Sequence, residues 1–221
     1  EKTLGPEHPD TATSLNNLAS TYSDLGQYDK ALPLQIRALA IREKTLGPEH
    51  PDTAISLNNL ALIYSDLGQY DKALLLQIRA LAIIEKVLGP EHQVAATSLL
   101  GLAKTYSLLA QYGEALPLQI RALAIREKTL GPEHPATAIS LNNLASTYSD
   151  LGQYDKALPL QIRALAIYEK ALGPEHPDTA RSLDNLALIY SDLGQYGKAL
   201  PLEIRALSIM ERLLGPGHRD T

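Results

Sequence analysis

The chain of 221 residues repeats itself every 42 residues. A Gly-Pro pair marks each period, and these pairs begin at Gly5, Gly47, Gly89, Gly131, Gly173 and Gly215. A fixed period in this range indicates a solenoid, in which one supersecondary unit is stacked many times. Such arrays usually work through a long surface and not through one catalytic pocket. The period therefore limits both the fold and the class of function.

We expect a single repeat array over residues 1–221. Five full units follow one another at 5–46, 47–88, 89–130, 131–172 and 173–214. Residues 1–4 match the end of a unit, and residues 215–221 match the beginning of one. We therefore expect partial repeats at both ends and a sequence that is a segment of a longer array.

The first unit illustrates how each repeat is expected to form two helices. The first helix is predicted from Pro9 to Leu25, since proline is favoured at the first helical position. His8 or Asp10 could cap this helix, and Gly26 suits its C-terminal end. One apolar stripe recurs at helical spacing and consists of Leu15, Leu18, Ala19, Tyr22 and Leu25. These signals predict an amphipathic helix.

The second helix of the unit is predicted from Tyr28 to Leu46. Its apolar positions cover an arc of roughly 220°, which is too wide for one packing partner. They are Tyr28, Ala31, Leu32, Leu34, Ile36, Ala38, Leu39, Ile41 and Leu46. The helix should therefore pack against the first helix of its own unit and that of the next. Pro33 lies in its second turn, where we expect a slight bend and no break.

The repeat resembles the tetratricopeptide repeat, a helix–turn–helix solenoid module. The matching positions are Asn17-Leu18-Ala19, Tyr22, Gly26, Tyr28, Ala31 and Ala38-Leu39. The phrase Leu-Gly-Pro-Glu-His-Pro-Asp-Thr-Ala at 46–54, followed by Ser-Leu-Asn-Asn-Leu-Ala at 56–61, is similar to the kinesin-light-chain-like type. This resemblance covers the whole chain. It implies an all-α solenoid, a right-handed superhelix of five repeats with the first helices lining the concave face.

Relatives with such arrays include motor cargo adaptors and signalling proteins with an upstream nucleotide-binding switch domain. The sequence contains no Gly-x-x-x-x-Gly-Lys-Ser/Thr motif, so no switch domain of that kind is expected here. The resemblance thus implies a protein-interaction scaffold that holds a peptide or protein partner in its concave groove.

One position of the second helix departs from the family pattern, which usually has an aromatic residue there. This chain has Gln35, Gln77, Gln119, Gln161 and Glu203 in the middle of the apolar arc. A buried amide without partners costs about 1–3 kcal/mol. We therefore predict that each of these Gln side chains is hydrogen-bonded to a neighbouring helix.

Pairs of asparagines are the main candidate binding residues. An Asn amide both donates and accepts hydrogen bonds, so it can pair with the backbone of an extended peptide. By the resemblance, the second Asn of each pair faces a bound peptide, and these residues are Asn17, Asn59, Asn143 and Asn185. Their neighbours Asn16, Asn58 and Asn142 complete the set, whereas Gly101 interrupts it. Alternatively, these amides bond across adjacent first helices and hold the stack together.

Two variable columns lie on the polar arc of the first helices. One contains Thr13, Ile55, Thr97, Ile139 and Arg181, and the other contains Ser20, Leu62, Lys104, Ser146 and Leu188. Changes there would alter what a groove binds while the core stays fixed. The alternative is that exposed positions simply drift.

Neither a metal site nor an active site is expected. The histidines His8, His50, His92, His134, His176 and His218 recur once per repeat, and zinc ligands must converge on one centre. We expect these histidines to serve in turns or caps. Every histidine and most serines and carboxylates recur in a structural column, and cysteine is absent. The sequence therefore predicts no enzyme and no cofactor.

Charge and hydropathy argue against two further classes of partner. A net charge of −5 argues against nucleic acid, which calls for a basic stripe. No apolar run approaches the ~18 residues of a membrane span. We expect an intracellular, cytoplasmic protein that binds a protein or peptide.

The alternative function is a structural or self-assembling array, or a sensor segment of a larger signalling protein. Its last helix ends in Ile209, Met210, Leu213 and Leu214, which we expect to lack a covering helix. Units this similar could stack head to tail, and such a contact produces an open chain of molecules and not a closed oligomer.

Overall fold

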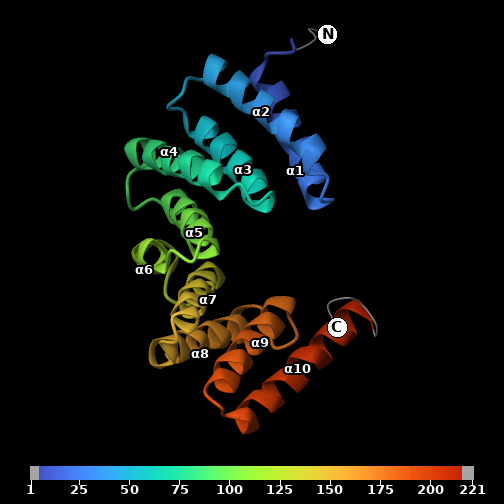
Figure 1. Ribbon diagram of the computed structural model, residues 1–221, viewed down its shortest axis with the longest axis vertical. Coiled ribbons are helices and arrows are strands. Elements are labelled where there is room, and N and C mark those ends of the chain that lie inside the picture. Colours follow the sequence, from blue (N-terminus) through green and yellow to red (C-terminus); the bar gives the residue numbers. More distant parts are fainter. Residues whose placement is uncertain (1–4, 216–221) are drawn as a thin grey trace. The chain divides into compact units, whose positions relative to one another are not determined.

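The computed structural model describes residues 5–215, without the side chain of Leu214, and shows ten helices and no strand over that range (Figure 1). The helices are α1 (Pro9–Asp24), α2 (Tyr28–Thr45), α3 (Pro51–Asp66), α4 (Tyr70–Leu88), α5 (Gln93–Leu108), α6 (Tyr112–Leu130), α7 (Pro135–Asp150), α8 (Tyr154–Ala171), α9 (Pro177–Asp192) and α10 (Tyr196–Leu214). The predictions for residues 1–4 and 216–221, including His218, lie outside the described residues.

Every repeat contributes two helices, which confirms the prediction of an all-α array of helix–turn–helix units. The first helices, α1, α3, α5, α7 and α9, are called the A helices, and each has 16 residues. The second helices, α2, α4, α6, α8 and α10, are called the B helices and have 18 or 19 residues. Figure 1 shows how the two helices of a repeat, such as α1 and α2, run side by side.

The contacts divide the chain into two compact units, residues 1–118 and 119–221. Unit 1 contains α1 to α5, and unit 2 contains α7 to α10, with the division inside α6. In unit 1, α2 packs against both α1 and α3, and α4 packs against both α3 and α5. In unit 2, α8 packs against both α7 and α9. The B helices α2, α4 and α8 are thus covered on two sides, as their wide apolar arc predicts.

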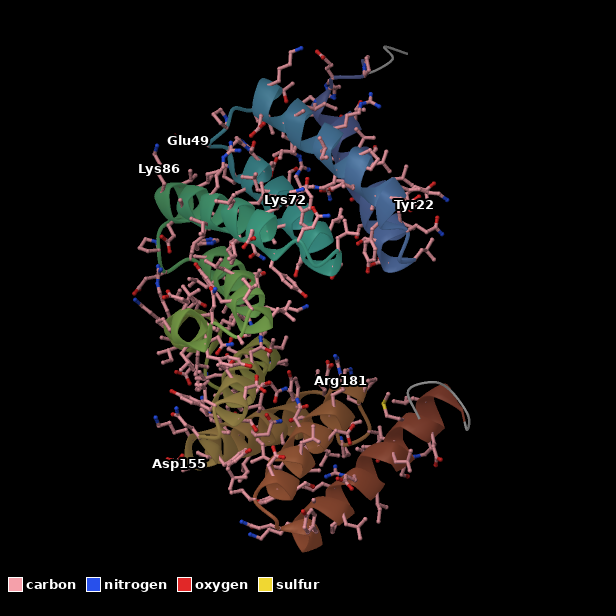
Figure 2. The ribbon with its side chains drawn as sticks, in the orientation of Figure 1. Tyr22, Glu49, Lys72, Lys86, Asp155 and Arg181 are labelled. Carbon is pink, nitrogen blue, oxygen red and sulfur yellow. The ribbon has the colours of Figure 1, made fainter. Side chains whose placement is uncertain are left out.

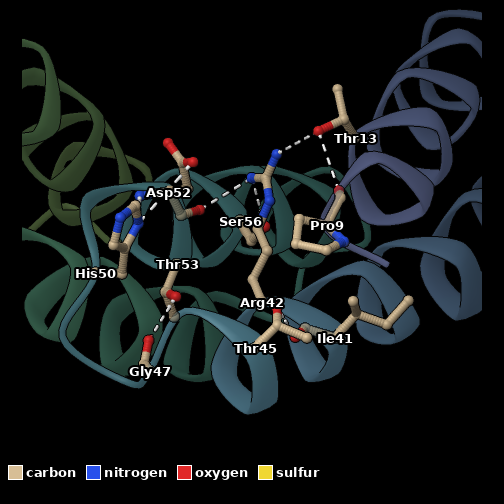
Figure 3. Close-up of polar contacts among 10 residues, drawn as sticks. All are labelled: Pro9, Thr13, Ile41, Arg42, Thr45, Gly47, His50, Asp52, Thr53 and Ser56. Carbon is tan, nitrogen blue, oxygen red and sulfur yellow. Dashed lines mark hydrogen bonds and ion pairs between the residues drawn. The ribbon is translucent and has the colours of Figure 1, made fainter. Parts of the chain in front are cut away.

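A histidine caps the N-terminus of each A helix. In Figure 3, the Nδ1 atom of His50 accepts a hydrogen bond from the backbone N–H of Asp52 at 3.1 Å. The same bond is made by His8, His92, His134 and His176. The Thr53 hydroxyl also donates to the carbonyl oxygen of Gly47 at 2.8 Å and ties the preceding loop to the helix. The predicted capping role is confirmed, and of His8 and Asp10 it is the histidine that caps.

The turns and the internal proline are as expected. Gly47 has a φ of +98°, a region open mainly to glycine, and it follows the end of α2. Helix α2 runs without a break through Pro33. Leu25 and Leu46, predicted as the last helical residues, instead form the C-caps of α1 and α2.

The core consists mainly of alanine, leucine and isoleucine from the helices of each repeat. Leu57, Leu99, Leu141 and Leu183 are fully buried at one position of the A helices. The B-helix arc is narrower than predicted, because Ile36 is 45% exposed. Its counterparts Ile78, Ile120, Ile162 and Ile204 are also exposed. Ile36 lies about 100° around the helix from the buried Gln35, beyond the contact with either A helix.

Ion pairs form both within a repeat and between successive repeats. The Nζ atom of Lys86 lies 2.6 Å from the Oε2 atom of Glu49, and both side chains are labelled in Figure 2. Arg79 pairs with Glu43 of the preceding B helix at 2.7 Å. These pairs are largely exposed and therefore weak contributors to stability. Over the described range, no helix has both the length and the apolar character required to cross a bilayer.

Candidate binding groove

The two variable columns lie exposed on the A helices. All five residues of each column are exposed, and Figure 2 shows one of them, Arg181, on α9. Exposed Ile55, Ile139, Leu62 and Leu188 place apolar side chains on this face among polar ones. The variation between repeats therefore changes the chemistry of an accessible surface.

A pocket of about 240 Å³ lies between α1 and α3 in unit 1. We call it the first acidic pocket, because the carboxylates of Asp24 and Asp66 lie in its wall. Its complete lining is Asn16, Ser20, Ser23 and Asp24 from α1, Gln35 from α2, Asn59, Leu62, Ile63 and Asp66 from α3, and Lys104 from α5. The structure thus brings together five of the predicted site residues, namely Asn16, Ser20, Asn59, Leu62 and Lys104.

The same pocket recurs in unit 2 and has a volume of about 190 Å³. This second acidic pocket is lined by Asn142, Ser146, Ser149, Asp150, Gln161, Asn185, Leu188, Ile189 and Asp192. Each of these residues lies three repeats after one in the first acidic pocket, as Asn142 does after Asn16. The pocket is therefore a property of the repeat and is formed wherever two A helices with this sequence adjoin.

A cluster of three amides forms the floor of the first acidic pocket. The Oδ1 atom of Asn16 accepts hydrogen bonds from Nδ2 of Asn59 at 2.8 Å and from Nε2 of Gln35 at 3.0 Å. Gln35 also donates to the backbone carbonyl of Ser56 at 3.1 Å. Asn59 therefore joins two A helices, and Asn16 is shared between three helices.

The prediction for the buried glutamines is confirmed. Gln77 donates to the carbonyl of Gly101 at 3.2 Å, and Gln119 donates to the hydroxyl of Thr147 at 2.9 Å. Gln161 donates to the backbone and the hydroxyl of Ser182. Glu203 differs, because its side chain is exposed on α10.

A second pair of pockets lies farther toward the N-terminal ends of the A helices. In unit 1, an apolar pocket of about 280 Å³ is lined by Ile55, Asn58, Asn59, Leu62, Gln77, Val94, Thr97, Ser98 and Gly101. In unit 2, a polar pocket of about 340 Å³ is lined by Ile139, Asn142, Asn143, Ser146, Tyr168, Asp178, Arg181 and Asn185. Corresponding positions carry Val94 against Asp178 and Gly101 against Asn185. Equivalent pockets in the two units thus have different chemistry.

The predicted asparagines do not form one uniform ladder. Asn58 donates to the hydroxyl of Ser98 at 3.1 Å, and Asn17 is exposed on α1 outside the linings of these four pockets. Asn143 lines the polar pocket, whereas Asn185 lines both pockets of unit 2. The sequence pattern did not reveal Asp24, Asp66, Asp150 and Asp192, although their fixed place at the end of four of the five A helices was a readable signal.

Burial and neighbouring charges shift the pKa values of several side chains in unit 2. Burial raises the pKa of the Asp150 carboxyl in the second acidic pocket. Burial, and then the negative charge of Glu203, raise the pKa of Asp184. Burial also raises the pKa of the Tyr168 hydroxyl, with a further contribution from Asp178 that the amide of Asn142 and the cation of Arg181 partly oppose. Ionised carboxylates at these positions favour a cationic or hydrogen-bond-donating neighbour.

The groove offers hydrogen bonding and charge. The four pocket linings contain no histidine, so no serine in them has an imidazole base within the lining. Within residues 5–215, no three histidine or carboxylate side chains are grouped so that they could hold a metal ion.

Two buried arginines were missed by the sequence reasoning. In Figure 3, Arg42 donates to the backbone carbonyl of Asp52 and to the hydroxyl of Ser56, both at 2.9 Å. Arg126 makes the same contacts two repeats later, with the carbonyl of Ala136 and the hydroxyl of Ser140. Burial lowers the pKa of Arg126. These side chains join a B helix to the next A helix and belong to the stack, not to the groove.

Comparison with known proteins gives a consistent result. A family model described as tetratricopeptide repeat matches residues 1–44, 10–83, 63–128, 108–170 and 140–212. A solved kinesin-light-chain-type protein of Podosopora anserina with nearly identical TPR-like repeats is 35% identical, with a TM-score of 0.80, and the match covers 93% of this chain and 97% of that one. BtubC (BKLC) of P. vanneervenii is 27% identical, with a TM-score of 0.81 and coverage of 96% and 85%. No curated protein sequence matches the chain.

Proposed function

Because this chain belongs to the tetratricopeptide repeat family, we propose that it is a non-enzymatic scaffold that binds a peptide or protein partner in the groove along its A helices. Repeats of this family commonly mediate protein–protein interaction. The observation that carries the proposal is the recurrence of the acidic pocket in both units. An intracellular, cytoplasmic location is part of the same proposal.

The pocket combines constant and variable residues in the way a binding groove requires. Its constant residues are amides, hydroxyls and carboxylates such as Asn16, Gln35 and Asp24, which can hydrogen-bond a polypeptide backbone whatever its sequence. Its variable residues include Leu62 and Lys104, which change between repeats and are exposed. Constant groups supply general affinity for an extended chain, while the variable ones select among side chains.

The test is selection of peptides from a random display library on the full chain, followed by affinity measurements on variants. Leu62→Arg and Leu188→Arg place a bulky cation in the two acidic pockets and should each abolish binding of the peptides that use that pocket. Leu75→Arg is the matched control, because Leu75 is 71% exposed on α4 and lines none of the four pockets. Peptides that bind all three variants equally would contradict groove binding.

A second candidate function is head-to-tail assembly, and a specific pair of observations favours it. Leu18 on α1 is 46% exposed, whereas its counterpart Leu60 on α3 is 4% exposed. Leu207 on α10 is 44% exposed, whereas its counterpart Leu39 on α2 is 9% exposed. Both leucines occupy positions that a neighbouring repeat covers elsewhere in the chain. An α1 face of one molecule could therefore cover the α10 face of another.

A further inference from the structure

The third repeat departs from the others at the positions that form the apolar pocket of unit 1. Val94 stands where the first, second and fifth repeats have Asp10, Asp52 and Asp178. Gly101 stands where all four other repeats have asparagine. With Ile55 and Leu62 on the facing helix α3, these changes give the pocket apolar walls and leave the space of one side chain open.

A buried acceptor without a partner lines this pocket. Gln77 is only 3% exposed, and its Nε2 atom donates to the carbonyl of Gly101 at 3.2 Å. Its Oε1 atom is buried and accepts no hydrogen bond. In the first repeat, the corresponding amide cluster contains the side chain of Asn59 at the position that Gly101 takes here. The loss of that amide accounts for the open space.

The neighbouring first acidic pocket adds charge to this arrangement. The two pockets share Asn59 and Leu62 in their walls, so a segment that fills one reaches the other. The acidic pocket presents the carboxylates of Asp24 and Asp66 against the single cation of Lys104. A cationic side chain next to the apolar pocket would therefore be attracted.

We propose that the apolar pocket is an anchor site for an extended partner segment that carries an aliphatic side chain and a nearby lysine or arginine. The aliphatic side chain enters between Ile55, Leu62 and Val94, a backbone N–H of the segment donates to Oε1 of Gln77, and the cation pairs with Asp24 and Asp66. This assignment rests on the proposed scaffold function and names its partner class in unit 1.

Gly101→Asn is the decisive variant, because it restores the residue of the other repeats. A Cβ atom at position 101 would lie 3.8 Å from Nε2 of Gln77, an ordinary van der Waals distance, so the side chain can be accommodated. Replacing a glycine within α5 also favours the helix. The melting temperature of Gly101→Asn should not fall. A loss of binding can therefore be attributed to the Asn side chain that fills the pocket and not to unfolding.

The experiment selects peptides from a random display library on the full chain and sequences them. Peptides that bind unit 1 should be enriched in a leucine, isoleucine, valine or methionine close to a lysine or arginine. Gly101→Asn should reduce the affinity of these peptides by about tenfold or more, which is the usual cost of excluding an apolar side chain from its site. Asp66→Asn should also reduce the affinity of these peptides. It should not reduce the affinity of analogues in which alanine replaces the basic residue.

The controls separate this inference from the proposed function. Asn185→Gly changes the corresponding position of unit 2 and should leave the unit 1 peptides unaffected. Peptides that are lost with Leu62→Arg but keep full affinity for Gly101→Asn would overturn the anchor site and leave groove binding intact. Enrichment of acidic residues beside the aliphatic one would overturn the charge assignment. A library that yields no binding peptide would overturn both proposals.

Discussion

Ala110 has a backbone conformation that the other repeats give to glycine. Its φ is +55°, while Gly68 at the same position has a φ of +70°. This region costs a residue with a Cβ atom about 1–2 kcal/mol. Glycine would remove this strain, but its greater freedom stabilises the unfolded chain by about 0.4–1 kcal/mol and so cancels part of the gain. We expect Ala110→Gly to raise the free energy of unfolding by about 0.5–1 kcal/mol.

Urea denaturation measures this change, with the reverse substitution as the control. Gly68→Ala should lower the free energy of unfolding by a similar amount, since no atom lies within 4 Å of a Cβ built at Gly68 and only the backbone conformation is strained. Equal stability of Ala110→Gly and the unchanged chain would show that the turn relaxes around alanine.

Asp184 gives a pH-dependent prediction. Burial and the charge of Glu203 raise its pKa, so the folded chain holds the proton of Asp184 more tightly than the unfolded chain does. The ionised carboxylate therefore lowers stability above the raised pKa, and this penalty disappears as the pH falls below the unfolded value of about 4. Asp184→Asn removes the charge at the position where the first repeat has Asn16.

The expected result is a higher melting temperature for Asp184→Asn at neutral pH, with a difference that shrinks as the pH is lowered toward about 4. Thermal unfolding followed by circular dichroism over this pH range checks it. A constant difference at all pH values would instead indicate a packing effect of the amide.

At the scale of the helix, histidine capping can be tested most cleanly at α7. The Nδ1 atom of His134 accepts from the N–H of Ala136 at 3.0 Å, and residue 136 carries no charge that would complicate the result. His134→Ala should lower the free energy of unfolding by about 1 kcal/mol, the usual cost of a lost N-cap. His134→Asn should lose much less, because the Asn side chain can accept the same bond.

Hydrogen exchange locates the effect of this change. The amides in the first turn of α7 should exchange faster in His134→Ala than in His134→Asn, while amides of α3 in unit 1 should be unchanged. A uniform increase over both helices would mean that the substitution destabilises the whole array and not this helix end.

The sequence predicted the helices well because their determinants are local. Proline and histidine at the start of α1 and glycine after α2 act within one or two turns. The burial of Ile36 was predicted wrongly, since the extent of an apolar arc does not show where the neighbouring helices end. The exposed Ile36 and the buried Gln35 show that position around the helix decides burial more than residue type.

The groove was predictable only in part. The variable columns are exposed as expected, whereas the pockets depend on residues from several helices that sequence spacing does not bring together. Gly101 was expected only to interrupt the row of asparagines. Its place beside Val94 and Ile55, and the unfilled acceptor on Gln77, become visible only when α3, α4 and α5 are packed.

At the scale of the whole molecule, sequence variation is divided between a constant stack and a variable surface. Successive repeats are held together by hydrogen bonds between side-chain amides, such as that from Asn59 to Asn16, and by buried arginines such as Arg42. Most positions of the variable columns can change without disturbing these contacts, because their side chains are exposed; Thr13 differs, since its hydroxyl accepts a hydrogen bond from Arg42 at 3.5 Å. A family of near-identical repeats can thus present a different pocket in each unit, as Val94 and Asp178 show.

The same near-identity predicts self-association through the uncovered faces of α1 and α10. Of the residues expected to lie uncovered on α10, Ile209 is instead fully buried within unit 2, and Met210 is packed against the same core. The exposed apolar positions are Leu207 and Leu213 on α10 and Leu18 on α1. Burying exposed leucine is favourable by about 1.5–3 kcal/mol per side chain, so a face with several leucines can support concentration-dependent assembly.

Sedimentation equilibrium over a range of concentrations should show association of the unchanged chain. Leu207→Glu should suppress it, because the contact would bury an unpaired carboxylate. Leu18→Glu should do the same from the other face, and a mixture of the two variants should form heterodimers but no longer chains, since each retains one intact face. Leu75→Glu adds the same charge at the exposed site on α4 and should associate like the unchanged chain. Association that survives both end-face substitutions would show that the molecules associate through another surface and that head-to-tail stacking is wrong. Loss of association in Leu75→Glu to the same extent would contradict it equally.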